Sequence, residues 1–191
     1  NSSTSIYAGN TMAADGVTNN NTINLSGNPN LTKAHIYGGN VVGTGNVLNV
    51  GYNVDETAKK WEKVAKDKTT YDIDGIHNFN VINFNNLAWE KGATVVKTSQ
   101  LELNDTKVNV WITSGTVADK EESMILIDAG DIYGNIAATG NTVKIYDGIS
   151  SIVTGITGAI SKDVANQDIV ITLTGVFKDN DKLEIWQGND S

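Results

Sequence analysis

Residues 34 to 53 read AHIYGGNVVGTGNVLNVGYN, and two short aliphatic runs in this stretch, HIY and VLNV, are embedded in Gly and Asn. Alternation of apolar and polar residues indicates a strand that buries one face. Gly and Asn tolerate the left-handed backbone that tight turns require. We therefore interpret the interruptions as corners, at which a chain of short strands changes direction.

The same alternation recurs along the chain. It predicts strands at 22–25, 47–50, 108–112, 143–146, 169–173 and 183–186. Related wording also returns, as NNNTINLSG at 19–27, GNVLNVG at 45–51 and GNTVKIYDG at 140–148, which is an imperfect internal repeat. Repeats of this kind favour a stacked array of coils. A strand every ten to thirteen residues is also typical of a β-sandwich, so spacing leaves both folds open.

Composition favours the stacked array. The chain has 24 Asn, 19 Gly and a single proline, Pro29. A β-solenoid has a thin core in which small aliphatic residues of successive coils stack, and its stacked Asn side chains can hydrogen-bond from coil to coil. At roughly 20 to 25 residues per coil, the chain would form about eight or nine coils. We predict an all-β parallel β-solenoid, elongated and single over residues 1–191, with strands of three to five residues.

One stretch departs from this pattern. Between residues 55 and 66, Ala58, Trp61, Val64 and Ala65 lie at helical spacing, and acidic residues precede the lysines. That order suits the dipole of a helix. We predict a short amphipathic helix or charged excursion here, which covers a loop or an end of the solenoid.

The charged residues exclude several classes of function. The chain has 22 acidic residues and 14 basic residues, all lysine, for a net charge of −8. Without arginine it has no bidentate group for phosphate or guanine, so nucleic acid is not an expected partner. Without cysteine it has neither a disulfide nor a thiolate site. No apolar run approaches the ~18 residues of a membrane helix, so we expect no membrane insertion by this segment.

Four stretches resemble one family. They are NLTKAHIYGGN at 30–40, GNVLNVGY at 45–52, HNFNVINFNNLAW at 77–89 and SMILIDA at 123–129. In this order they are similar to the passenger region of bacterial autotransporters, and together they cover about half of the chain. The last fifty residues match this family only loosely, and the stretch 55–66 departs from a regular coil.

This resemblance implies a right-handed parallel β-helix on the outside of a Gram-negative cell, where passengers act as adhesins or their stalks. It also implies an N-terminal export signal and a C-terminal membrane barrel. We therefore expect a segment excised from a longer passenger. The lack of cysteine fits this export route, because a passenger crosses the outer membrane unfolded. The expected partners are proteins or glycans of host or bacterial cells, including like cells in self-association.

Few residues suggest chemistry. His35 and His77 lie 42 residues apart, in neither metal nor triad spacing, and we expect His35 to face solvent or a corner. Asp72 and Asp74, and likewise Asp179 and Asp181, are candidate carboxylates for calcium or for polysaccharide cleavage. The first pair lacks the later ligands of a calcium loop, and the second resembles an ordinary polar turn. We predict no catalytic, metal or cofactor site.

An exposed row of tryptophans on a solenoid would suit stacking against sugars. The four tryptophans are Trp61, Trp89, Trp111 and Trp186, and we expect them at the ends or edges of the core instead. The favoured function is a non-catalytic structural or adhesive segment. The alternatives are a secreted polysaccharide lyase or hydrolase on the same helix, which needs a groove of converging carboxylates or lysines, and a carbohydrate-binding β-sandwich.

Overall fold

The computed structural model describes residues 3–12, 16–27, 29–51, 70–147, 151–152, 155–175 and 183–185. These residues are all-β, with 68% in strands and none in a helix. The helix or excursion predicted at 55–66 lies outside the described residues. The strands are β1 (Thr4–Tyr7), β2 (Thr22–Leu25), β3 (Leu31–Tyr37), β4 (Val47–Val50), β5 (Tyr71–Trp89), β6 (Thr94–Val117), β7 (Glu121–Tyr133), β8 (Thr142–Asp147), β9 (Ser151–Ile152), β10 (Ile156–Asp163), β11 (Asp168–Gly175) and β12 (Leu183–Ile185). They include every strand predicted from alternation.

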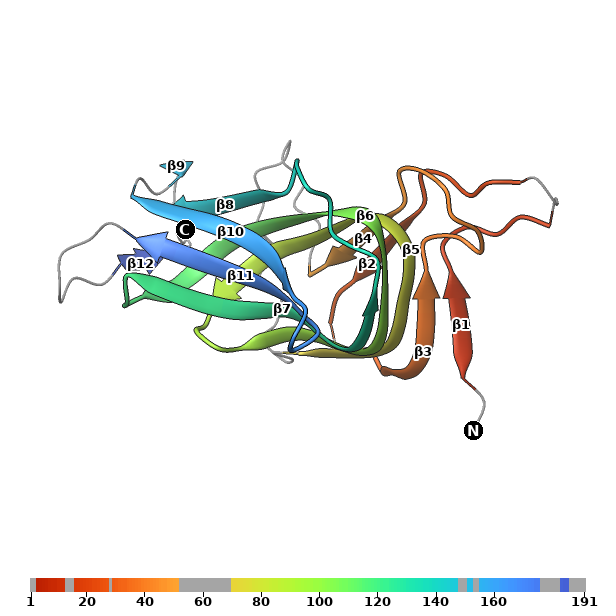
Figure 1. The fold of residues 1–191 in the computed structure, drawn as a ribbon, viewed down its shortest axis with the longest axis horizontal. Helices are drawn as coiled ribbons and strands as arrows, with labels where there is room; N and C mark the ends of the chain where they lie inside the picture. The colour runs from red at the N-terminus through yellow and green to blue at the C-terminus, as the bar shows by residue number, and fades with distance from the viewer. Residues whose placement is uncertain are drawn as a thin grey trace.

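Two parallel ladders organise the sheet (Figure 1). One runs β1-β3-β5-β6-β7 and the other β2-β4-β5-β6-β8, and every neighbouring pair in both is parallel. Partners are separated by 25 residues where Thr22 meets Val47 and by 40 where His35 meets Gly75. Five strands per ladder contradict the prediction of eight or nine coils, because the chain uses more residues between partners than the estimate of 20 to 25 allowed.

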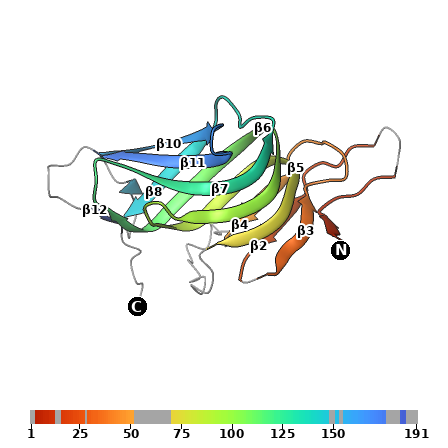
Figure 2. The same ribbon diagram turned by 60° about the horizontal axis from the view of Figure 1, so that its bottom comes forward.

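The two strands shared by the ladders are long and bent (Figure 2). β5 has 19 residues and β6 has 24, whereas the sequence predicts strands of three to five. Left-handed residues lie within them, Asn78 and Asn86 in β5 and Asp105 and Gly115 in β6. The corners predicted from Asn and Gly are therefore confirmed, but strand pairing resumes at once beyond each corner, so several predicted strands merge into one.

Stacked aliphatic side chains form the core. Leu48 of β4 lies beside Ile82 of β5, which lies beside Val108 of β6, and each is at most 1% exposed. A second column consists of Ile36, Ile76 and Leu101. Burial of one such side chain contributes about 1.5 to 3 kcal/mol. The expectation that small aliphatic residues stack from strand to strand is confirmed.

An asparagine column crosses the second ladder. We define it as Asn24, Asn49, Asn83 and Asn109, capped by Thr142, one residue from each strand. The Nδ2 of each later asparagine donates to the Oδ1 of the preceding one, at 2.7, 2.8 and 3.0 Å. Thr142 Oγ1 donates to Asn109 Oδ1 at 2.8 Å. The predicted hydrogen bonding of asparagines between neighbouring strands is thus confirmed.

The C-terminal strands run in the opposite sense. β10 and β11 form an antiparallel hairpin, β11 pairs antiparallel with β7, and β12 pairs antiparallel with β6. Ile169, Ile171 and Leu173 of β11 are fully buried against the core. The sheet is therefore mixed and mostly parallel. Alternation predicts these strands but not their direction, because it carries no information on pairing.

Among the described residues, no helix is long and apolar enough to cross a membrane.

Candidate functional site

The two histidines of the chain meet on the outer face of the first ladder. His35 of β3 lies beside Gly75 of β5, and Tyr37 lies beside His77. Nδ1 of His35 and Nε2 of His77 are 2.9 Å apart, within hydrogen-bonding distance. The sequence separation of 42 residues hid this contact. The expectation that His35 faces solvent or a corner is only partly right, since it is half-buried on an open face.

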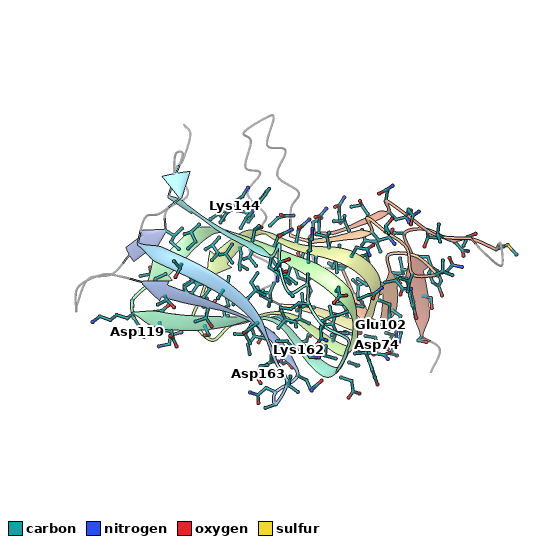
Figure 3. All side chains as sticks on the ribbon, turned by 45° about the horizontal axis from the view of Figure 1, so that its top comes forward. Asp74, Glu102, Asp119, Lys144, Lys162 and Asp163 are labelled. Carbon is teal, nitrogen blue, oxygen red and sulfur yellow. The ribbon has the colours of Figure 1, made fainter. Side chains whose placement is uncertain are left out.

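A carboxylate lies at each end of the histidine pair. Nε2 of His35 is 3.4 Å from Oδ2 of Asp74, and Nδ1 of His77 is 3.0 Å from Oε2 of Glu102. Figure 3 shows Asp74 and Glu102 on the same part of the molecule, far from Asp119 and Lys144. We call these four residues the histidine array: Asp74, His35, His77 and Glu102.

Gly75 makes the array possible. A Cβ on this residue would lie 2.2 Å from Nδ1 of His35 and 2.5 Å from Nε2 of His77, far inside van der Waals contact. Its backbone needs no special conformation, so the requirement is for space alone. The absence of a side chain lets the two imidazoles approach across β5.

Hydrogen bonding constrains the protons of the array. If neutral His77 donates from Nδ1 to Glu102, its Nε2 must accept, so His35 must donate from Nδ1. Nε2 of His35 then attracts Asp74 only when it too carries a proton. A second proton on His77 would set two N–H groups against each other. Burial lowers the pKa of His77, a charge on His35 lowers it further, and Glu102 partly offsets both effects.

Aromatic rings extend from the array along the ladder. Tyr37 stacks on His77 with ring centroids 4.5 Å apart, and Tyr7 stacks on Tyr37 at 4.6 Å. Burial raises the pKa of Tyr37, and the neighbouring Tyr7 and Glu102 raise it further. Tyr37 therefore stays a neutral phenol at physiological pH, and the column carries its charge only at the histidine end.

A shallow groove borders the array. It lies across β3, β5, β6 and β7 and is lined by Thr32, Asp72, Ile73, Asp74, Lys97, Thr98, Ser99, Asp128 and Gly130. Strand register places Lys97 between Asp72 and Asp128, and Asp168 of β11 lies beyond Asp128. The structure thus brings the predicted carboxylates Asp72 and Asp74 to one surface, where Asp128 and Lys97 join them.

This arrangement holds protons and charges but lacks other parts of a catalytic centre. Among the described residues, no three His, Asp, Glu or Cys side chains are grouped so as to hold a metal ion. No aromatic residue lines the groove, so a sugar ring would find no stacking surface there. The chemistry that the residues support directly is proton exchange within the array and polar contact along the groove.

The other predicted candidates lie apart from this face. Trp89 is buried and donates from Nε1 to Oε2 of Glu122 at 2.8 Å. Trp111 is half-buried, with the Nζ of Lys144 5.1 Å from its ring centroid. Neither belongs to an exposed row. Trp61, Trp186 and the pair Asp179 and Asp181 lie outside the described residues.

Glu102 is the member of the array that the sequence analysis missed. A signal for it does exist, because Ile36, Ile76 and Leu101 are the apolar centres of three successive strands. Alignment of HIY, GIH and QLE on these centres places His77 next to Glu102. The choice of these three strands as neighbours required knowledge of the pairing.

In comparisons with known proteins, no family model, no curated protein and no solved structure matches this chain.

Proposed function

We propose that the chain is a right-handed parallel β-helix and a non-catalytic segment of the passenger of a bacterial cell-surface autotransporter. The observation that carries this proposal is the pair of parallel five-strand ladders. The four stretches that resemble passengers supply strands to these ladders, and two of them contribute asparagine-column residues, Asn49 and Asn83. Antiparallel sandwiches do not have this pairing.

The proposed role is structural and adhesive. A stack of parallel strands with a continuous aliphatic core is stiff along its axis, because every strand is bonded to the next. Such a segment holds loops away from the cell, where they contact a protein or glycan of a host or neighbouring cell. The net charge of −8 keeps the surface soluble and favours partners with basic patches.

The groove supports a second candidate, a polysaccharide-active enzyme on the same fold. Asp72, Asp74, Asp128 and Lys97 converge there, as such an enzyme requires. Against it, Asp72 and Lys97 are exposed to water, and no ring stacks beside them. Catalytic carboxylates usually lie in a site that excludes water and orients the sugar. We therefore favour the non-catalytic role.

Two measurements on the whole chain test this proposal. First, a panel of acidic and neutral polysaccharides is incubated with the chain and scored for new reducing ends or unsaturated products. We expect none. Turnover that Asp128→Asn abolishes, with Asp119→Asn at an exposed site as the matched control, would establish the enzyme instead.

Second, beads coated with the chain are presented to host cells, to extracellular matrix and to a glycan array. Retention on at least one surface, competed by free chain, is the expected result. Small-angle X-ray scattering of the same sample checks the fold, because a β-helix gives an elongated envelope and a sandwich a rounded one. A rounded envelope together with no retention would overturn the proposal.

A further inference from the structure

The two ends of the stacked strands differ. At one end, β7 is covered by the β11–β10 hairpin, and a Cβ on Gly158 of β10 would lie 2.4 Å from the side chain of Val143 in β8. At the other end, β1 pairs only with β3 and β2 only with β4 among the described strands. Figures 1 and 2 both place β1 at the outside of the sheet. We call this end the β1–β2 edge.

Backbone groups of β1 face outward at this edge. The amide of Ala8 donates to the carbonyl of Tyr37 in β3 at 2.9 Å. Because successive residues of a strand point their amides to opposite sides, the N–H and C=O groups of Ser5 and Tyr7 face away from β3. These groups are available to pair with one more strand.

The β1–β2 edge lacks the features that normally protect an exposed strand. Soluble proteins place charges, prolines or bulges on such strands to prevent pairing with other chains. β1 reads TSIY, and its four residues pair with β3 without a register shift. Residues 1–32 hold one charged side chain, Asp15, although the chain has 36 (22 acidic plus 14 basic). Ile6 and Tyr7 remain 39% and 44% exposed.

Both side-chain columns end open at this edge. Each asparagine of the column donates toward the preceding strand, so the Nδ2 of Asn24 is directed beyond β2. Tyr7 stacks on Tyr37 with one ring face, and its other face points away from the ladder. An amide donor, an aromatic face and a strand edge thus face the same side.

We propose that the β1–β2 edge is the docking surface for a second copy of this chain. Two copies that meet at this edge add β1 of each to the sheet of the other, in the self-complementary arrangement of a two-fold dimer. Electrostatics selects the same surface, because copies with a net charge of −8 repel each other wherever charged faces meet and least where charge is nearly absent. This inference does not depend on the adhesive role.

Sedimentation velocity of the full chain over a concentration series, at physiological salt, tests the proposal. We expect the sedimentation coefficient to rise from that of a monomer to that of a dimer. Ser5→Pro removes one outward amide without a cost to the pairing with β3, and Ser5→Lys sets two like charges together across the two-fold axis. Each variant should weaken the dimer by at least about tenfold. Val164→Lys, at an exposed position in the β10–β11 turn, should leave the dimer unchanged.

Hydrogen exchange supplies an independent readout. The amides of Ser5 and Tyr7 should exchange more slowly at concentrations that favour the dimer, while the Ala8 amide stays protected throughout. A chain that remains monomeric at every concentration overturns the proposal, including the case in which the edge instead takes a strand of another protein. A dimer that survives both Ser5 variants, or that Val164→Lys disrupts equally, overturns it as well.

Discussion

The asparagine column and the histidine array both cross β5 and β6, but they join these strands by different chemistry. In the column, identical neutral amides repeat on every strand, and each donates and accepts one hydrogen bond. In the array, four different residues are matched once, and both bonds to carboxylates depend on protons that titrate. Repetition thus gives an attachment that is insensitive to pH, whereas the array is local and conditional.

Charge explains where each arrangement is tolerated. The column reaches partly buried positions, since an amide pair costs little to bury when both groups are satisfied. The array needs an open face, since Asp74 and Glu102 retain their charge through contact with water, with 31% and 51% of their side chains exposed. We expect substitutions in the column to alter stability at every pH and those in the array to alter its pH dependence.

The largest effect should follow Asn83→Ala. This residue donates to Asn49 and accepts from Asn109, so its loss leaves one oxygen and one amide without partners. We expect the free energy of unfolding to fall by about 2 to 3 kcal/mol in urea titrations. Asn24→Ala removes one bond at the exposed end and should cost less than about 1 kcal/mol. Equal losses would show that the column does not act as a connected series.

Gly75→Ala should break the array sterically. A methyl group there would overlap both imidazoles, and we expect a loss of about 1 to 3 kcal/mol in the free energy of unfolding. The variant should cost less when His35→Ala is already present, because one of the two clashing rings is gone. A double-mutant cycle measures this difference, expected at about 0.5 kcal/mol or more. Strict additivity would place the clash elsewhere.

Acid should weaken the fold through His77. Its pKa is lowered in the folded chain, chiefly by burial, so the unfolded chain takes up a proton first as the pH falls. Stability should therefore decline as the pH drops through about 6.5, by roughly 1 kcal/mol, and level off below the folded pKa. His77→Gln should flatten this decline, measured by urea titration from pH 7.5 to 5. Asn83→Ala should keep the slope of the wild-type chain, and a steep residual slope in His77→Gln would exclude the assignment.

The smallest effect is expected from Asp168→Asn, at the end of the groove's charged column. Burial raises the pKa of Asp168, and the charges of Asp128 and Asp163 raise it further. A raised pKa means that ionisation opposes folding, so the penalty is absent below pH ~4 and grows as the pH rises. The variant should gain roughly 0.5 to 1 kcal/mol at pH 7 and almost nothing at pH 4 in thermal melts. A loss at pH 7 would mean that the carboxylate holds an unrecognised partner.

Local features of the fold follow from the sequence, and long-range ones do not. Alternation locates the strands, and Asn and Gly locate corners such as Asn78 and Gly115, because both signals depend on neighbouring residues. The number of stacked strands does not follow, since the offset between partners varies from 25 to 40 residues. The antiparallel direction of β11 is equally invisible, because a buried strand reads the same in either sense.

The site shows the same limit. Asp72 and Asp74 stand out in the sequence because they flank one isoleucine, and both line the groove. The contact of His35 with His77 could not be predicted, because it depends on which strands are neighbours across residues 38–74. Gly75 carries no signal at all in the sequence, since its role is to leave space for two side chains from other positions.

Spin labelling tests the central claim, that the strands stack in parallel register, most directly. The chain has no cysteine, so Ser5→Cys and Asp131→Cys give two unique labels on exposed sites, diluted with unlabelled chain. Register places these residues four strand spacings apart, through His35, Gly75 and Gln100. At ~4.8 Å per spacing, the account predicts one narrow distance distribution near 19 Å. A broad distribution, or one displaced by more than about two spacings, would contradict it.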